Sequence, residues 1–137
     1  MTNEALIQEA KKAREKSYSP YSHFQVGAAL VGKSGKVYHG CNIENASYSP
    51  TNCAERTAFF KAISEGEKEF VKIAIVGGVE GMEPEELCAP CGVCRQVMRE
   101  FCSDDFKILI IRENENYDKV LLKDLLPQSF KPEILSK

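Results

Sequence analysis

The sequence predicts an α/β domain in three layers, α/β/α, built on one mixed sheet. Nearly unbroken apolar runs at residues 70–79 and 107–111 are typical of strands covered on both faces. A third apolar segment, residues 24–31, is followed by a Gly-Lys-Ser-Gly turn and a partner strand, which is a hairpin pattern. Because helical patterns separate the later strands and the connections are short, we expect helices on both faces of the sheet.

Length and charge limit the classes of function. With 137 residues and a mass of 15.3 kDa, the chain fits a single domain, residues 1–137, because two independent cores would each be too small. A formal net charge of -2 argues against nucleic acid as the main partner, since proteins that bind a phosphate backbone usually carry a basic surplus. No apolar stretch approaches the roughly 20 residues that span a bilayer, so no membrane partner is expected. The N-terminus lacks the apolar centre of a secretion signal, and we expect a cytoplasmic protein.

The first element is an amphipathic helix over residues 3–16. Leu6 and Ala10 lie on its apolar face, and Thr2 or Asn3 can cap its N-terminus. The Ser-Pro-Tyr-Ser string that follows is typical of a turn.

A hairpin and a second helix come next. Residues 24–31 and 36–43 are the predicted hairpin strands, and residues 42–52, which have no steady period, form a loop. The second helix is expected to begin near Cys53 and to end at Gly66 in the left-handed conformation.

The second half of the chain continues the alternation. After the strand at residues 70–79, a helix is predicted from about Cys91, and the strand at residues 107–111 follows. Residues 120–126 resemble a short helical segment stopped by a proline, and the remaining tail is expected to be a polar coil.

Six cysteines are many for a chain expected in a reducing compartment, where thiols more often bind metal than form disulfides. Cys91 and Cys94 have i, i+3 spacing at the start of a predicted helix, which places both sulfurs on one side of its first turn. The helix N-terminus favours negative charge, lowers the thiol pKa and prepares thiolates for zinc.

Cys53 stands at the start of the other predicted helix, where the helix dipole likewise favours its thiolate form. Two helix N-termini that each follow a strand and a loop can converge at one end of a sheet, where ligand sites form in open α/β folds. Three thiolates, from Cys53, Cys91 and Cys94, with a free fourth position are typical of a catalytic zinc ion.

Glu55 is the candidate proton carrier. On an ideal helix, residues i and i+2 point apart, so the spacing brings Glu55 to the metal only if Cys53 stands at the very start of the helix. In the alternative interpretation, Glu55 has no catalytic role and only interacts favourably with the positive N-terminal end of the helix dipole.

Other assignments of the cysteines remain open. Cys88 precedes Cys91 by three residues, so Cys53, Cys88, Cys91 and Cys94 could instead form a closed structural zinc site. Cys41 and Cys102 have no chemical neighbour in the sequence, and we expect small buried hydrophobic side chains at both.

Two motifs resemble the cytidine deaminase superfamily. They are Cys-Ala-Glu at residues 53–55 and Pro-Cys-Gly-Val-Cys at residues 90–94. Longer strings resemble the small tetrameric cytidine deaminases in particular: FQVGAAL, GCNIENASYS, CAERTAFFKA and PCGVCRQV. The resemblance covers about residues 17–130 and implies a cytidine deaminase-like fold with a mixed five-stranded sheet.

The resemblance implies one Zn²⁺ per subunit and a hydrolytic reaction in pyrimidine salvage. Cytidine and 2′-deoxycytidine would become uridine and 2′-deoxyuridine plus ammonia. Glu55 would take a proton from zinc-bound water and pass it to N3, the hydroxide would attack C4, and Glu55 would then protonate the leaving amine.

The resemblance also assigns substrate contacts and partners. Asn42 and Glu44 would bind the ribose hydroxyls, Phe24 would lie beside base and sugar, and Ala54 would contact the substrate. Phe130, in Leu-Leu-Pro-Gln-Ser-Phe, would cover the base from another subunit of a homotetramer with shared active sites. The partners implied are a small nucleoside and further copies of the chain.

Two arginines are candidates for contact with the sulfurs. Three thiolates on Zn²⁺ leave a net negative site, which makes bound water less acidic. By resemblance, Arg56 donates to a cysteine sulfur and offsets this charge. Arg95 is a second candidate.

Three other functions compete with this hypothesis. The chain could deaminate a related small heterocycle, such as blasticidin S or a nucleotide. It could be a zinc-stabilised binding or scaffold protein without turnover. A role in editing RNA or DNA is disfavoured by the net charge and by the lack of interleaved basic and aromatic residues.

Overall fold

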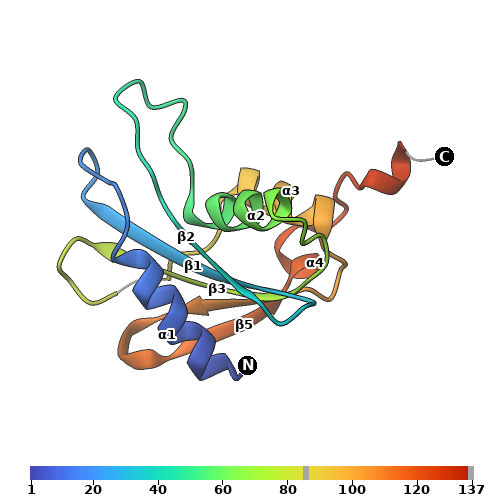
Figure 1. Cartoon of the computed structure of the whole chain (residues 1–137), viewed down its shortest axis with the longest axis horizontal. Helices are drawn as coiled ribbons and strands as arrows, with labels where there is room; N and C mark the ends of the chain where they lie inside the picture. Colours follow the sequence, from blue (N-terminus) through green and yellow to red (C-terminus); the bar gives the residue numbers. More distant parts are fainter. Residues whose placement is uncertain (85–86, 136–137) are drawn as a thin grey trace.

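The computed structural model describes residues 1–84 and 87–135 and contains one five-stranded sheet (Figure 1). The strand order is β2-β1-β3-β4-β5. Only β3 and β4 run parallel, and the other neighbours are antiparallel, so the predicted mixed sheet is confirmed. The strands are β1 (Phe24–Gly32), β2 (Val37–Cys41), β3 (Phe70–Val79), β4 (Lys107–Ile111) and β5 (Tyr117–Leu121).

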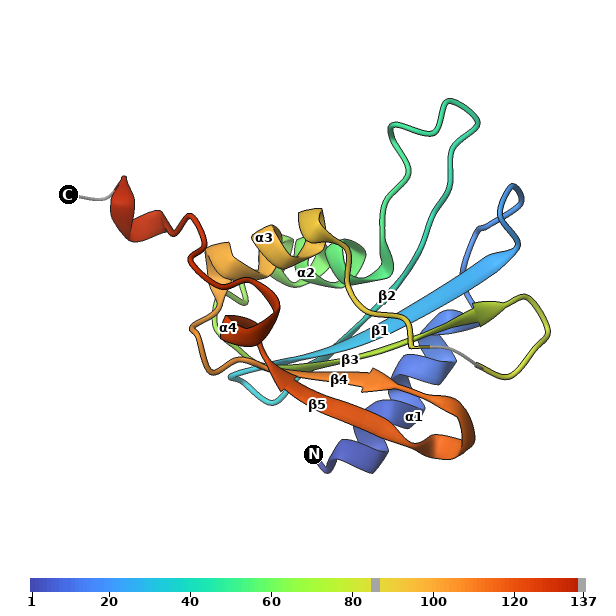
Figure 2. The same cartoon turned by 180° about the vertical axis from the view of Figure 1, so that it is seen from behind.

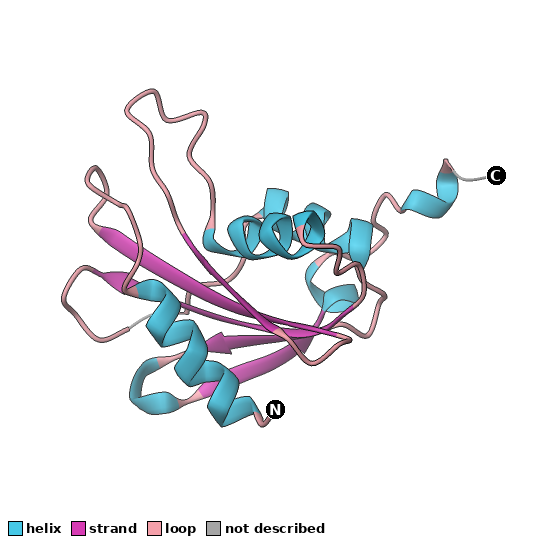
Figure 3. Cartoon of the chain, viewed as in Figure 1, coloured by secondary structure: helices cyan, strands magenta, loops and turns pink. Residues whose placement is uncertain are grey.

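Helices cover both faces of this sheet, as the three-layer prediction requires. Figures 2 and 3 show α1 on one face, with α2 and α3 side by side on the other. None of the helices in the described residues is long and apolar enough to cross a membrane. The helices are α1 (Asn3–Arg14), α2 (Ala54–Ser64), α3 (Gly92–Phe101) and α4 (Leu122–Leu125), with short 3-10 turns η1 (Glu113–Glu115) and η2 (Pro132–Ile134).

The two faces of the sheet carry separate hydrophobic cores. Along β1, Ala28 and Leu30 belong to the core under α2 and α3, whereas Ala29 and Val31 pack under α1. This division follows from the alternation of side chains along a strand. Because both faces are covered, the central strands contain almost no polar residues, which is the pattern that predicted them.

The cap of α1 and the glycine after α2 agree with their sequence signals. The Thr2 hydroxyl accepts a hydrogen bond from the Ala5 amide at 3.1 Å and caps α1, which ends two residues before its predicted end at residue 16. Gly66 follows α2 with a φ of 99°, the predicted left-handed conformation.

The C-terminal third differs from the pattern-based prediction. Residues 117–121 form the edge strand β5, so the helix predicted over residues 120–126 is wrong at its start. The strand Tyr-Asp-Lys-Val-Leu mixes charged and apolar residues, because an edge strand is half exposed and needs no apolar run. The tail, predicted as coil, contains the turn η2.

One end of the sheet gathers the segments that carry the candidate residues. Phe24 at the start of β1 pairs with Val79 at the end of β3, and Gly27 pairs with Cys41 at the end of β2. The loops that leave β2 and β3 at this end lead directly to the N-termini of α2 and α3. Gly40 lets α2 lie close to β2, because a Cβ there would come within 2.2 Å of the Ala54 carbonyl oxygen.

Candidate metal centre and active site

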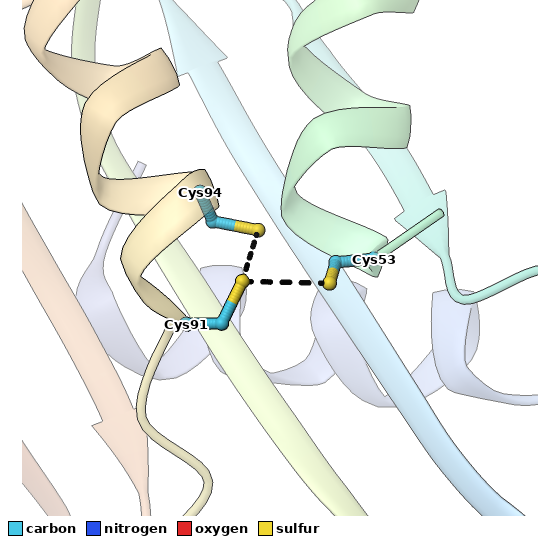
Figure 4. Close-up of side chains that lie close together, drawn as sticks. All are labelled: Cys53, Cys91 and Cys94. Carbon is cyan, nitrogen blue, oxygen red and sulfur yellow. Dashed lines mark hydrogen bonds between the residues drawn. The ribbon is translucent and has the colours of Figure 1, made fainter. Parts of the chain in front are cut away.

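Three sulfur atoms meet where α2 and α3 begin (Figure 4). The Cys53 sulfur lies 3.7 Å from the Cys91 sulfur, which lies 3.4 Å from the Cys94 sulfur. All three sulfurs lie within 4.8 Å of one another. The structure therefore brings together the three residues that the sequence predicts as metal ligands.

Backbone conformation explains how the two helices present these thiols. Cys53 is the N-cap of α2 (φ -77°, ψ 156°) and Cys91 is the N-cap of α3 (φ -68°, ψ 167°). Neither sulfur makes a capping hydrogen bond to its own helix, so both remain directed at the cluster. Cys94 lies in the first turn of α3 and is 1% exposed.

The sulfur positions fit a tetrahedral zinc ion. Zinc–sulfur bonds of about 2.3 Å at tetrahedral angles separate the sulfurs by about 3.8 Å. The Cys53–Cys91 and Cys91–Cys94 sulfur separations, 3.7 and 3.4 Å, lie near this value. Three ligands leave a fourth position for water or substrate, which is the arrangement of catalytic zinc sites.

The electrostatics of the cluster favour a thiolate. The Cys94 thiol, then Arg56 and Cys91, lower the pKa of Cys53 to about 5, against a desolvation effect that raises it. The pKa of Cys94 is raised in turn, because its thiol interacts with the Cys53 sulfur and is desolvated. The site therefore holds negative charge at neutral pH before any cation enters, and it suits a divalent ion.

Glu55 lies beside the cluster and is almost completely enclosed. It is the second residue of α2 and is only 4% exposed. Burial raises the pKa of its carboxyl group to about 7, and the negative charge of Cys53 acts in the same direction. A carboxyl group with this pKa can both accept and donate a proton near neutral pH.

The two candidate arginines have different roles. Arg56 Nη2 donates to the Cys53 sulfur at 3.3 Å, as the resemblance implies. Arg95 instead donates to the carbonyl oxygens of Pro90 and Leu125 at 2.7 and 2.9 Å. Arg95 therefore links the start of α3 to the end of α4. Neither of these two hydrogen bonds goes to a cysteine sulfur.

The remaining cysteines stand apart from the cluster. Cys88 does not join the group of three sulfurs, so the closed four-cysteine site receives no support. Its sulfur packs against Gly77, and burial raises its pKa to about 12. Cys41 and Cys102 are partly rather than fully buried, and desolvation raises the pKa of both.

Comparison with known proteins agrees with this centre. Residues 1–110 match the family model of the cytidine and deoxycytidylate deaminase zinc-binding region. The chain belongs to the cytidine and deoxycytidylate deaminase family. All three clustered cysteines and Glu55 fall within the matched residues.

Relatives of this deaminase family match almost the whole chain. A cytidine deaminase of Sporosarcina psychrophila is 49% identical over 99% of this chain and 96% of its own length. One from Halalkalibacterium halodurans is 50% identical over 97% of each. The crystal structure of cytidine deaminase from Burkholderia pseudomallei has a TM-score of 0.86 at 49% identity, covering 95% of this chain and 100% of that one.

The predicted ribose contacts of this deaminase family member lie at the same end of the sheet. Asn42 is 9% exposed, and its amide donates to the Phe24 carbonyl at 2.8 Å and accepts from the Val26 amide at 2.9 Å. Glu44 accepts hydrogen bonds from the backbone amides of Tyr21 and Ser22 at 3.0 and 3.1 Å.

The other predicted contacts differ in exposure. Phe24 is 38% exposed and borders a cavity of about 350 Å³ with Gly77 and Met82. Ala54 is fully buried as the first residue of α2. Phe130 is 55% exposed, and its carbonyl accepts from Gln96 on α3 at 3.0 Å.

One residue beside these contacts was not singled out from the sequence. The hydroxyl of Ser22 bonds both the Glu44 carboxylate and the Phe24 amide, at 2.5 and 3.0 Å. Ser-Pro-Tyr-Ser at residues 19–22 predicts only a turn, because serine is common in turns. The sequence feature that could have indicated a role for Ser22 is its position two residues before Phe24, a predicted substrate contact.

Proposed function

We propose that this protein is a zinc-dependent cytidine deaminase that converts cytidine and 2′-deoxycytidine to uridine and 2′-deoxyuridine with release of ammonia. The observation that carries the proposal is the cluster of Cys53, Cys91 and Cys94 beside a buried carboxyl group, Glu55, with a raised pKa. Family membership and the relatives named cytidine deaminase support the choice of substrate.

The three thiolates would hold one Zn²⁺ per subunit. When bound, the ion supplies a water molecule of lowered pKa and stabilises negative charge on its oxygen. Arg56 donates to the Cys53 sulfur and so reduces the negative charge of the thiolate set.

Glu55 carries protons through the reaction. Its carboxylate takes a proton from the attacking water and delivers it to N3 of the cytosine, which makes C4 more electrophilic. After the oxygen has bonded to C4, Glu55 takes the second proton from that oxygen and gives it to the exocyclic amine, so that the C4–N4 bond breaks, the C4 carbonyl forms and ammonia leaves. Cytidine and water thus give uridine and ammonia, and the enclosed position of Glu55 supplies the pKa near 7 that both transfers require.

The nucleoside is held by groups at the same end of the sheet. Phe24 lies beside the base and sugar, Asn42 and Glu44 bind ribose hydroxyls, and Ala54 contacts the substrate. An amide and a carboxylate suit hydroxyl groups, because an analogue without those hydroxyls leaves them unpaired. Glu44 is ionised more readily than an ordinary glutamate, since Ser22 donates to it and lowers its pKa.

A homotetramer with shared active sites is part of the proposal. The C-terminal segment projects away from the sheet and helices in Figures 1 and 2. Phe130 on this segment is 55% exposed, so its ring is available to a neighbouring subunit. In that position it would cover the base of a nucleoside bound by the neighbour.

The first experiment measures the loss of cytidine absorbance with zinc-loaded protein and with Glu55→Gln. The amide keeps the shape of Glu55 but cannot carry a proton, so we expect full zinc content and a loss of turnover of at least about 10²-fold. A zinc-bound wild type without turnover would indicate the scaffold alternative. Faster turnover of blasticidin S or a cytidine nucleotide would assign a different substrate to the same centre.

A further inference from the structure

The hydroxyl of Ser22 joins two of the proposed nucleoside contacts. Its oxygen accepts a hydrogen bond from the Phe24 backbone amide at 3.0 Å and donates to Glu44 Oε2 at 2.5 Å. The other oxygen, Glu44 Oε1, accepts from the amides of Tyr21 and Ser22. Both carboxylate oxygens are therefore held by the same short turn.

The same network reaches the third contact. The Phe24 carbonyl accepts from Asn42 Nδ2 at 2.8 Å, and Asn42 Oδ1 accepts from the Val26 amide at 2.9 Å and from the Ser17 hydroxyl. Phe24 is thus fixed through its amide by Ser22 and through its carbonyl by Asn42.

The turn that carries Ser22 is itself fixed to the fold. His23 adopts a φ of 59°, a conformation that non-glycine residues seldom take. Its amide donates to the Ser19 carbonyl at 3.0 Å, and its carbonyl accepts from the Glu80 amide at 2.7 Å. Ser22 is therefore presented to Glu44 from a backbone that is held by Ser19 in the same turn and by Glu80 after the end of β3.

This arrangement bears on binding because a glutamate on a loop otherwise explores many rotamers. Fixing the carboxylate before the substrate arrives removes an entropic cost of binding. The Ser22 hydroxyl is also the largest influence that lowers the pKa of Glu44, which keeps the carboxylate ionised as an acceptor.

We propose that Ser22 is a positioning residue for recognition of the ribose, because its hydroxyl sets the Glu44 carboxylate and the Phe24 backbone in the arrangement that binds the nucleoside. This inference rests on the proposed function. Ser22 acts through Glu44 and Phe24 and takes no part in proton transfer.

The test is Ser22→Ala, assayed with cytidine and with 2′,3′-dideoxycytidine, which lacks both ribose hydroxyls. Loss of a hydrogen bond to a charged group predicts a rise in KM for cytidine of roughly tenfold, with kcat little changed. KM for the dideoxy analogue should rise less than KM for cytidine, because that analogue gives Glu44 no hydroxyl and depends on Ser22 only through Phe24. Ser22→Thr keeps a hydroxyl and should restore the KM for cytidine.

Ser34→Ala is a matched control. The Ser34 hydroxyl also accepts from the amide two residues later, Lys36, at 3.3 Å and donates to a distant carboxylate, Glu67. It lies in the turn after β1, at the opposite end of the strand from Phe24. A similar small change in Tm is expected for both variants, whereas KM should rise only in Ser22→Ala.

A double variant separates positioning from general damage. In a Glu44→Gln background, Ser22→Ala should raise KM for cytidine by a smaller factor than in the wild type, because one of the two groups that it positions is already altered. An active wild type with equal KM increases for the two substrates, or with an unchanged KM in Ser22→Ala, overturns this inference alone. A zinc-loaded wild type that turns over neither substrate overturns the proposed function and this inference with it.

Discussion

The guanidinium of Arg56 donates to the sulfur of Cys53, its neighbour across the first turn of α2, at 3.3 Å. Cys53 caps the helix and Arg56 lies three residues later, so the cap conformation turns the sulfur back towards the arginine. The centre thus contains three thiol groups and one permanent positive charge. That balance determines how acidic a zinc-bound water can become.

Replacing Arg56 with glutamine should lower both zinc affinity and kcat/KM by about ten- to a hundredfold, as for other groups that bond a metal ligand. Chelator competition measures the affinity, and the cytidine assay measures turnover. Arg112→Gln is the control, because that guanidinium pairs with Asp118 on the surface. Equal zinc affinity in wild type and Arg56→Gln would contradict the role given to Arg56.

Serine substitutions distinguish the open zinc site from the closed four-cysteine alternative. Cys94→Ser removes a sulfur of the cluster and should abolish stoichiometric zinc binding. Cys88→Ser should keep one zinc ion per chain and most of the turnover, since Cys88 lies outside the cluster. Elemental analysis of the purified variants measures both. Loss of zinc from Cys88→Ser would show a fourth thiolate ligand.

The raised pKa of Glu55 predicts how the metal-free protein responds to pH. Its folded pKa is about 7 and its ordinary value is 4.5, so the folded state binds the proton more tightly. Stability should therefore fall as pH rises from about 4.5 to 7, by up to ~3 kcal/mol. Denaturant unfolding of wild type and Glu55→Gln at pH 4.5 and 8 isolates this contribution, because the variant shares the other titrating groups. If the difference in unfolding free energy between wild type and Glu55→Gln were the same at pH 4.5 and at pH 8, the predicted contribution of Glu55 would be refuted.

Gly40 tests the packing that brings α2 to the site. A Cβ at Gly40 would come within 2.2 Å of the Ala54 carbonyl oxygen, so Gly40→Ala should displace α2 and lower stability by about 1–3 kcal/mol or more. Gly92→Ala is the control, because a Cβ there would have no neighbour within 4 Å apart from the adjacent residues and the backbone of its own helix. Thermal unfolding compares the two, and an equal Tm would contradict the close approach.

The sequence predicted the buried elements better than the exposed ones. Strands β3 and β4 are apolar on both faces, so composition alone identifies them. Strand β5 pairs with β4 through its backbone at the edge of the sheet. Its charged residues break the apolar pattern by which a strand is identified in the sequence. Backbone pairing leaves no composition signal at such an edge, which is why a helix was expected over part of it.

Within the site, the ligand set was predictable from spacing, but the position of Glu55 was not. On a regular helix, Cys53 and Glu55 would point apart. The extended conformation of Cys53 (φ -77°, ψ 156°) removes that restriction, because the cap residue does not follow the helical rotation. The network around Ser22 was also beyond prediction, since it depends on a turn and a loop 22 residues apart in the chain.

Two of the three sulfurs belong to residues that precede a helix rather than lie within it. Anyone wishing to transplant this centre into an artificial scaffold would therefore have to graft two strand–loop–helix junctions. Copying Cys-x-Glu and Cys-x-x-Cys onto the middle of two ready-made helices would rotate the side chains away from a common point. The smallest segment that could be transferred is therefore the pair of helix N-termini together with the residues that precede them, because the helices alone lack Cys53 and Cys91.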